Sequence, residues 1–205
     1  MKILLLPLAI LAFLAFAATP GQGAVFAIDL SPVGGSALNL GSTTYTGDHA
    51  IGLAAPNETA QPASPATGNE IGAGITYDDV TNILSFDVAY GSAFGFVDLG
   101  SAFSDAHFHA PGPVNFPAVN TSAPIIHPLG GFHTPSGTLS GRITGTVVLT
   151  AGQETDLFDN EIYLNIHSTG FPGGEIRGQL IPVPEPSAAL LFLVSGGLLV
   201  FRRRR

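Results

Sequence analysis

Hydrophobic and polar residues alternate along several short stretches in the middle of the chain. One stretch runs from Ile71 to Tyr77 and the next from Leu84 to Tyr90, with a turn-forming sequence at residues 78–82 between them. Successive side chains of a β-strand point to opposite faces, so this alternation places the hydrophobic residues on one side. The pattern therefore predicts a β-hairpin with one buried face.

Further strands are predicted at residues 24–30, 106–110, 139–149, 162–167 and 175–181, where short apolar or alternating runs are bounded by Gly, Pro, Asn or Asp. No long stretch in this part of the sequence has the period of an α-helix. Many short strands separated by turn residues are typical of antiparallel β-structure. We therefore expect an all-β fold, either an antiparallel β-sandwich or a barrel-like single domain.

Two stretches, residues 56–68 and 111–135, are rich in proline and small residues. Proline lacks the amide hydrogen that a strand ladder needs, so the first stretch is predicted to be an exposed loop and the second to wrap the surface in an extended conformation. His127 and His133 lie in the second stretch, and His49 lies in other loop-like sequence. We expect these three histidines to be exposed to solvent.

The N-terminal segment has the order of parts of a secretory signal peptide. A basic residue precedes an apolar run at residues 3–16, and small residues follow. Cleavage by signal peptidase fits after either Ala17 or Gly23, so its position is left open. We therefore expect an exported chain with a signal peptide at residues 1–23 and one domain of about 160 residues at 24–182.

The C-terminal segment, residues 183–205, has three parts in a fixed order. They are the tripeptide Pro184, Glu185 and Pro186, an apolar run at residues 188–201, and a terminal basic cluster of Arg202, Arg203, Arg204 and Arg205. As a helix the apolar run is roughly 21 Å long, which is short for a hydrocarbon core of about 30 Å. The arginines hold the end of the chain at the cytoplasmic side of a membrane.

This order of parts resembles the PEP-CTERM sorting tail of bacterial exported proteins, which an exosortase recognises and cleaves. The resemblance implies transit through the inner membrane by means of the tail, followed by delivery to the cell surface or the extracellular matrix. It also implies an exosortase-type enzyme and signal peptidase as processing partners. The alternative is a tail that is kept as a permanent membrane anchor with a transmembrane helix.

The charge of the chain is strongly asymmetric. Of its 7 basic residues only Arg142 and Arg177 lie within residues 24–182, whereas nearly all of its 15 acidic residues lie there. The domain therefore repels nucleic acid and anionic lipid. Such a charge is typical of solubility outside the cell, with recruitment of a cationic partner as the alternative. The absence of cysteine excludes disulfides, thiol nucleophiles and zinc–thiolate sites.

Two segments carry most of the residues that are able to do chemistry. The first is residues 105–113, with a His-x-His sequence, and the second is residues 163–180. Together they resemble the CHRD domain, the module named for chordin. Its members carry an Ala-His-Ile-His-Gly-Pro motif and a Tyr-Val-Asn-Val-His-Thr segment that leads to Gly-Glu-Ile-Arg-Gly.

The second motif matches this chain almost completely, and Phe108 and Ala110 are mild departures from the first. The matching positions are His107, His109, Tyr163, Asn165, His167, Gly174, Glu175, Arg177 and Gly178. The resemblance implies an all-β domain in an extracellular setting. The binding of growth factors associated with chordin is not carried over to this chain.

The histidines of the two motifs are candidate metal ligands. His107 and His109 are two positions apart in a predicted strand, so they point to the same face. If the strand that carries His167 is a neighbour, three imidazoles converge, and zinc or copper suits such a set. The alternative is a structural role, with hydrogen bonds to the backbone or to Asp105 and no cofactor.

Glu175 and Arg177 also share a strand face. A guanidinium binds a carboxylate through two parallel hydrogen bonds, so we expect Arg177 to pair with Glu175, Asp105 or another carboxylate and to set the strand register. The alternative is that Glu175 is a catalytic carboxylate, but the sequence identifies no second residue for general acid–base catalysis.

Three functions remain open. The first is a non-enzymatic exported protein of the cell surface or exopolysaccharide matrix, with a binding or structural role toward an exopolysaccharide or a surface protein. The second is a metalloprotein that uses His107, His109 and His167. The third is a glycan-active enzyme with carboxylates from among Asp105, Glu161 and Glu175. The first requires no catalytic site and agrees with both ends of the chain, so it is our prediction.

Overall fold

The structure is a computed structural model that describes residues 24–31, 35–40, 43–58, 62–111 and 123–183. The predicted signal peptide, the PEP-CTERM tripeptide, the apolar run and the basic cluster lie outside these residues. None of the helices within the described ranges is long and apolar enough to cross a membrane.

The described chain consists mostly of β-strands, with one short α-helix and three 3-10 turns. The strands are β1 (Val25–Leu30), β2 (Gly35–Leu40), β3 (Thr43–His49), β4 (Leu53–Ala54), β5 (Thr67–Asp78), β6 (Ile83–Tyr90), β7 (Phe103–His109), β8 (Ile125–Pro128), β9 (His133–Pro135), β10 (Gly141–Val148), β11 (Tyr163–Ser168) and β12 (Phe171–Pro182). The helix is α1 (Ala151–Phe158), and the 3-10 turns are η1 (Ala55–Asn57), η2 (Ser92–Phe94) and η3 (Gly130–Phe132).

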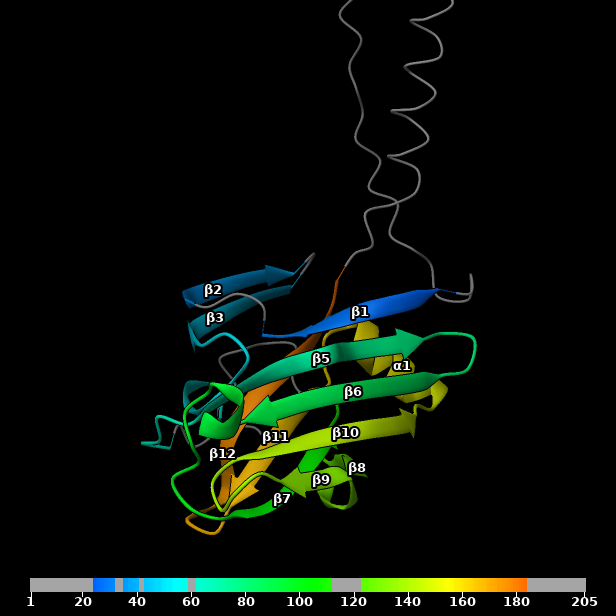
Figure 1. Ribbon diagram of the computed structural model, residues 1–205. Coiled ribbons are helices and arrows are strands. Elements are labelled where there is room, and N and C mark those ends of the chain that lie inside the picture. The colour runs from blue at the N-terminus through cyan, green and yellow to red at the C-terminus, as the bar shows by residue number, and fades with distance from the viewer. Residues whose placement is uncertain (1–23, 32–34, 41–42, 59–61, 112–122, 184–205) are drawn as a thin grey trace, which may run out of the picture. The chain divides into compact units, whose positions relative to one another are not determined.

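The main sheet follows one antiparallel path, in the order β8-β7-β11-β12-β1-β5-β6-β10-β9. Its two edge strands, β8 and β9, are consecutive in the chain and are joined by η3. The sheet therefore curls back on itself, with β5, β6 and β10 on one side of the domain and β7, β11 and β12 on the other (Figure 1). This arrangement confirms the predicted all-β, barrel-like fold.

Two short strands, placed end to end, share the position between β12 and β5 in the sheet. β1 pairs with both neighbours at one end, and β4 pairs with both at the other. The amide of Gly52 donates to the carbonyl of Leu30, which joins the end of β1 to the start of β4. The chain between them leaves the sheet and forms the separate β2–β3 pair.

The inner faces of the strands form one hydrophobic core. Phe86 of β6 packs edge-on against Phe108 of β7, with 5.4 Å between the ring centroids. Four strands separate β6 from β7 along the sheet, so this contact crosses the interior of the domain. Both rings are almost completely buried, and each such burial stabilises the fold by about 1.5–3 kcal/mol.

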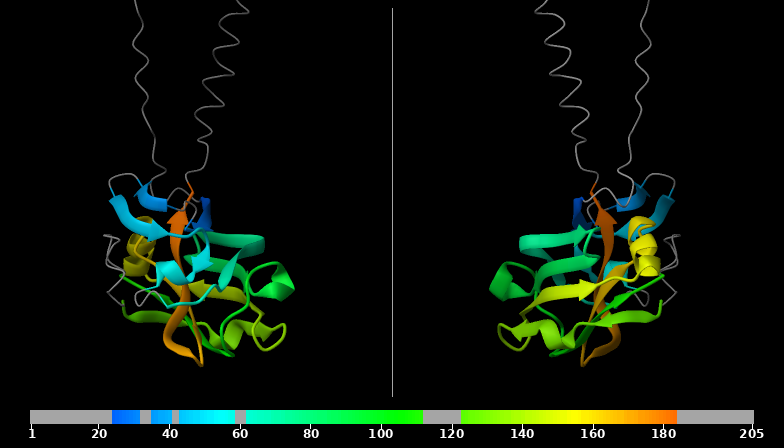
Figure 2. Two further views of the ribbon diagram at one scale, coloured as in Figure 1. Left: turned by 90° about the vertical axis from the view of Figure 1, so that its left-hand side faces the viewer. Right: turned by 90° about the vertical axis from the view of Figure 1, so that its right-hand side faces the viewer.

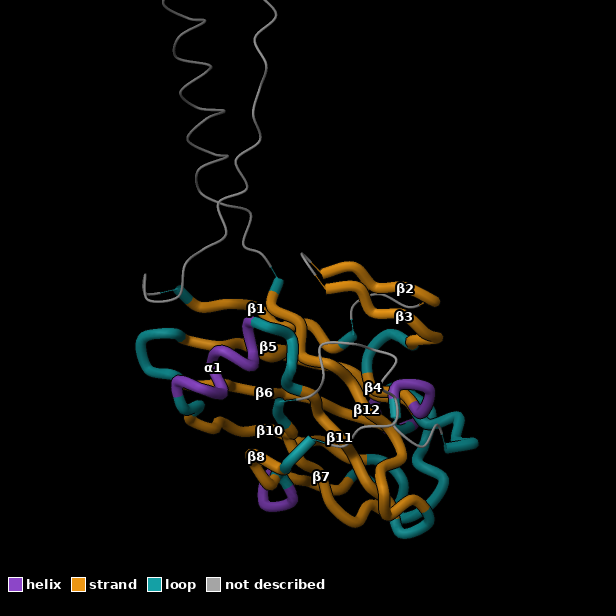
Figure 3. Tube along the Cα trace, turned by 180° about the vertical axis from the view of Figure 1, so that it is seen from behind, coloured by secondary structure: helices purple, strands orange, loops and turns teal. Residues whose placement is uncertain are grey.

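The helix α1 lies beside β12 and near one end of the β1-β5-β6 layer (Figures 2 and 3). Its last residue, Phe158, packs edge-on against Phe26 of β1 and Tyr77 of β5, at ring-centroid distances of 4.9 and 5.9 Å. At the other end, Thr150 and Gln153 form a capping box. The helix therefore covers an edge of the core, and the capping box defines its first residue.

The predicted hairpin is confirmed as β5 and β6, and the strands predicted at 139–149, 162–167 and 175–181 are confirmed as β10, β11 and β12. The stretch predicted to be irregular and extended, residues 111–135, contains the short strands β8 and β9 and the turn η3. These strands are two of the shortest and lie at the sheet edges, where proline is tolerated. The helix α1 and the β2–β3 pair were not predicted.

Candidate metal centre

Three histidines project from the outer face of two neighbouring strands. His107 and His109 come from β7 and His167 comes from β11, and the two strands are hydrogen-bonded to each other. Ala106 and Phe108, which alternate with the two histidines on β7, are fully buried in the core. The alternation of β-strand side chains therefore places all three imidazoles on the opposite face of the sheet.

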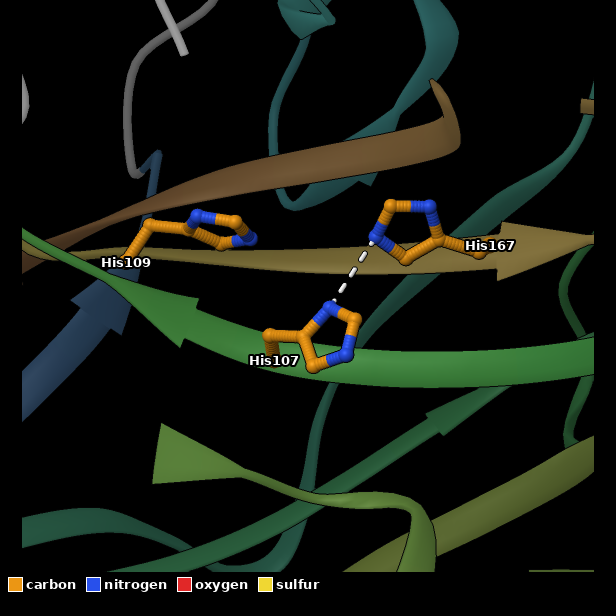
Figure 4. A group of neighbouring side chains, drawn as sticks. All are labelled: His107, His109 and His167. Carbon is orange, nitrogen blue, oxygen red and sulfur yellow. Dashed lines mark hydrogen bonds between the residues drawn. The ribbon is translucent and has the colours of Figure 1, made fainter. Parts of the chain in front are cut away.

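The three rings converge on one point outside the sheet. The Nδ1 atom of His107 lies 3.2 Å from the Nε2 atom of His167. Figure 4 shows these two rings facing each other, with the ring of His109 directed toward the space beside them. One ring nitrogen from each of the three histidines lies within 4.8 Å of the others, which is the spacing of a metal-binding cluster. The structure therefore brings together the three histidines that the sequence analysis named as candidate ligands.

The outward-facing nitrogen of each ring has its own acceptor. His107 Nε2 lies 3.0 Å from an oxygen of Asp105, and His167 Nδ1 lies 3.0 Å from the carbonyl oxygen of Pro172. His109 Nδ1 lies 2.8 Å from the carbonyl oxygen of Ala123. These oxygens accept hydrogen bonds and do not donate them, so each outward nitrogen carries the proton of its ring.

This proton arrangement leaves three bare lone pairs at the centre of the cluster. A neutral imidazole has one N–H group, and here each is directed outward. The inward atoms, His107 Nδ1, His109 Nε2 and His167 Nε2, are then all unprotonated. His107 Nδ1 and His167 Nε2 lie 3.2 Å apart, a distance at which the two rings share a hydrogen bond when one of these atoms carries a proton. A cation between them would satisfy both, and the outward hydrogen bonds are of the kind that orient histidine ligands around a metal.

His109 is the most enclosed of the three. The residue is 7% exposed, and its Nε2 atom is buried with no hydrogen-bond partner among the described residues. Burial lowers its pKa to about 4, and the hydrogen bond to Ala123 opposes that change only in part. Burial also lowers the pKa of His167. Both rings are therefore neutral at physiological pH, as metal ligands must be.

Tyr163 links the cluster to Arg177 on β12. The rings of His109 and Tyr163 are parallel, with centroids 4.8 Å apart, and the guanidinium carbon of Arg177 lies 3.4 Å from the centroid of Tyr163. The hydroxyl of Tyr163 accepts a hydrogen bond of 3.0 Å from the amide of Ala123. The backbone at Ala123 therefore fixes the rings of both His109 and Tyr163. Burial raises the pKa of Tyr163.

Glu175 is the centre of a hydrogen-bond network that lies beside the histidine cluster and does not include the histidines. Its carboxylate is fully buried and accepts hydrogen bonds of 2.6 Å from the Ser64 hydroxyl and from the Gly100 amide, and a short one from the Ser168 hydroxyl. These partners lie in three different segments of the chain. Glu175 therefore joins two long loops to β11, and its partners are hydroxyls and an amide instead of the expected guanidinium.

The other residues of the family motif pack beside these groups. Asn165 lies across from His107 on β11, and its Oδ1 atom is buried with no hydrogen-bond partner among the described residues. Gly174 has a φ of +119°, and a Cβ there would come within 2.8 Å of Glu58 and Asn165. At Gly178 a Cβ would lie 3.0 Å from the carbonyl oxygen of Gly52. Both glycines are thus required by close packing.

The remaining candidate residues lie elsewhere. His127 and His133 are partly buried strand residues, so the prediction that they face solvent was wrong. His133 bonds to the hydroxyl of Tyr90 and stacks on Phe103, with 3.7 Å between the ring centroids. Glu161 follows α1, where burial and then the charges of Asp156 and Asp159 raise its pKa.

Sequence reasoning missed the groups that orient the histidines. The carbonyls of Ala123 and Pro172 accept from His109 and His167, but every residue has a carbonyl, so no sequence signal marks these two. Only Asp105, two positions before His107, was a recognisable neighbour.

A comparison with protein families finds one match, to the family described as the CHRD domain, over residues 50–180. This range contains β4 to β11 and most of β12, and therefore all three histidines. No curated protein and no solved structure matches the chain.

Proposed function

The chain belongs to the CHRD-domain family, and we propose that its β domain binds one late first-row divalent metal ion, zinc or copper, as a non-enzymatic module of an exported protein. The domain is an all-β unit of a kind consistent with a secreted or extracellular protein. The ligands are His107 Nδ1, His109 Nε2 and His167 Nε2. Imidazole nitrogen is a preferred ligand of both metals.

The observation that carries this proposal is the orientation of the three rings. A solvent histidine adopts whichever tautomer its surroundings allow, but here each ring is held by an outward acceptor and presents a lone pair inward. The buried Nε2 atom of His109 has no other described partner. Leaving a buried acceptor unsatisfied costs about 1–3 kcal/mol, which a bound cation would offset.

The spacing also agrees with a tetrahedral metal. Nitrogen ligands at about 2.0–2.1 Å from zinc lie roughly 3.4 Å from one another in tetrahedral geometry. The distance between His107 Nδ1 and His167 Nε2 is 3.2 Å. The third nitrogen lies within 4.8 Å of the others, so a metal bound by all three would draw the rings closer together.

The experiment that tests this proposal is metal analysis of the purified chain after incubation with zinc or copper and desalting. We expect close to one metal ion per chain in the parent protein and a loss of at least tenfold in affinity for His109→Ala. The matched control is His127→Ala, which removes a partly buried histidine from the neighbouring strand β8 and should keep the metal. Equal metal content in the parent and in His109→Ala would rule out the site.

We also propose that the chain is exported and sorted. The support is the order of parts at its two ends, a leader at residues 1–23 and the PEP-CTERM-like tail at residues 183–205. The partners of this process are signal peptidase and an exosortase-type enzyme, and the destination is the cell surface or an exopolysaccharide matrix. The intact mass of the protein from its native cells tests this, because a mass that retains the arginine cluster would contradict sorting by cleavage.

A glycan-active enzyme is the less favoured function. A catalytic carboxylate must touch its substrate, but Glu175 is fully buried and bound by three hydrogen-bond donors. Asp105 bonds to His107, and Glu161 lies in an acidic group beside α1. Release of sugar from matrix polysaccharide by the parent protein, and its loss in Glu175→Gln, would contradict the non-enzymatic proposal.

A further inference from the structure

We propose that the metal bound by the three histidines keeps one coordination position open, and that this position binds a small anion with an oxygen or nitrogen donor. This inference rests on the proposed metal site and concerns what that site can bind. Metal sites with four protein ligands are structural, whereas those with three leave a position for an exogenous ligand.

The described residues supply three ligands to the cluster and no fourth. His107, His109 and His167 are the set of metal-binding residues found together in the described part of the chain. The nearest carboxylate, Asp105, is already hydrogen-bonded to the outward nitrogen of His107 and therefore orients that ligand. The other described histidines that have placed side chains, His127 and His133, belong to β8 and β9.

Among the described residues, the side of the cluster formed by His107 and His167 is the less buried one. His109 is buried, but His107 and His167 are only partly so. The side chain of Asp105, next to His107, is 47% exposed. The turn that follows His167 is largely exposed, and Gly173 in this turn has open space where a side chain would be. A small ligand can thus approach between the two partly exposed rings without displacing the core.

The local charge favours an anion although the domain as a whole is acidic. A divalent ion with three neutral imidazoles has a charge of +2, and the carboxylate of Asp105 offsets only one unit. A monoanion on the metal would bring this group of charges closer to neutrality.

The test is a spectroscopic titration of the copper(II)-loaded full chain with azide and with formate. Both are small anions, and pyridine serves as a neutral donor for comparison. We expect azide to produce a saturable charge-transfer absorption band, and both anions to change the electron paramagnetic resonance spectrum of the copper, while metal analysis shows that the copper stays bound. The control variant His127→Ala should respond as the parent does.

The possible results separate this inference from the proposed function. A parent protein that binds copper with nitrogen hyperfine structure but shows no spectral change with any of the three ligands would overturn the open position. A response to pyridine without a response to the anions would overturn the preference for anions. If the parent retains no copper after desalting, the metal site itself is refuted, and the titration is not needed to show it.

Discussion

Replacing Glu175 by glutamine tests how two loops beside the histidine cluster are held to β11. The Glu175 carboxylate is fully buried and accepts hydrogen bonds from the hydroxyls of Ser64 and Ser168 and from the amide of Gly100. Ser168 also accepts from the hydroxyl of Ser101, at 2.9 Å. Glutamine has nearly the same shape, so the substitution changes the charge and the hydrogen bonds while it leaves the packing intact.

The cost follows from these contacts. The glutamine oxygen can still accept from Ser64 and Gly100, but as neutral bonds, which are about half as strong as those to a carboxylate. Its NH₂ group then faces the Ser168 hydroxyl, whose hydrogen loses its acceptor in a fully buried place. An orphaned buried donor costs about 1–3 kcal/mol, so we expect a total loss of about 3 kcal/mol in the free energy of unfolding. For a domain of this size that lowers the melting temperature by roughly 6–12 °C.

Urea denaturation followed by far-UV circular dichroism and by tyrosine fluorescence measures this loss, since the chain has 4 tyrosines and no tryptophan. The control is Asp159→Asn, which removes an exposed carboxylate after α1 and should change stability by less than about 0.5 kcal/mol. A decrease in the free energy of unfolding below about 1 kcal/mol for Glu175→Gln, with an unchanged dependence on urea concentration, would refute the argument that the buried carboxylate holds the two loops to β11.

Three further predictions concern the cluster itself. Asp105→Asn removes the charge that orients His107 and should weaken metal binding about tenfold in a competition titration. Unchanged affinity would mean that the hydrogen bond between Asp105 and His107 does not orient the ligand. Tyr163→Phe leaves the buried amide of Ala123 without its acceptor and should lower the free energy of unfolding by about 1–2 kcal/mol in urea; no change would mean that another group takes its place. The pKa of His109 is lowered from 6.5 to about 4, so folding favours its neutral form, and stability is full above about pH 6.5 and falls as the pH drops toward 4. For the metal-free protein we expect a loss of about 1–2 kcal/mol between about pH 8 and pH 5, and a smaller one in His109→Gln; equal losses in both would contradict it.

The strands of the core were largely predictable because their residues carry a local signal. Burial of one face requires alternation, and β5, β6, β10, β11 and β12 all show it. The short strands β8 and β9 lack that signal, since their pairing comes from long-range partners on β7 and β10. The helix α1 is too short for a clear period, although the capping pair Thr150 and Gln153 was a usable sign of its start.

The same division applies to the candidate site. That His107 and His109 share a face follows from their spacing alone. That His167 lies 3.2 Å from His107 depends on the pairing of β7 with β11, which are far apart in the sequence. The partners of Glu175 were not predictable for the same reason, because Ser64 and Gly100 come from loops without a periodic pattern.

By itself, the sequence determined that the domain is all-β, acidic and free of cysteine, and which histidines share a strand face, because these properties depend on composition and on the two-residue period of a strand. Only the tertiary structure decided which strands are neighbours, where each imidazole proton points and which carboxylate is enclosed. Those features depend on contacts between residues distant in the chain, and on backbone carbonyls such as those of Ala123 and Pro172 that every residue has. Their positions, and therefore the inward direction of the three lone pairs, are set only when the strands have paired and the loops have packed against them.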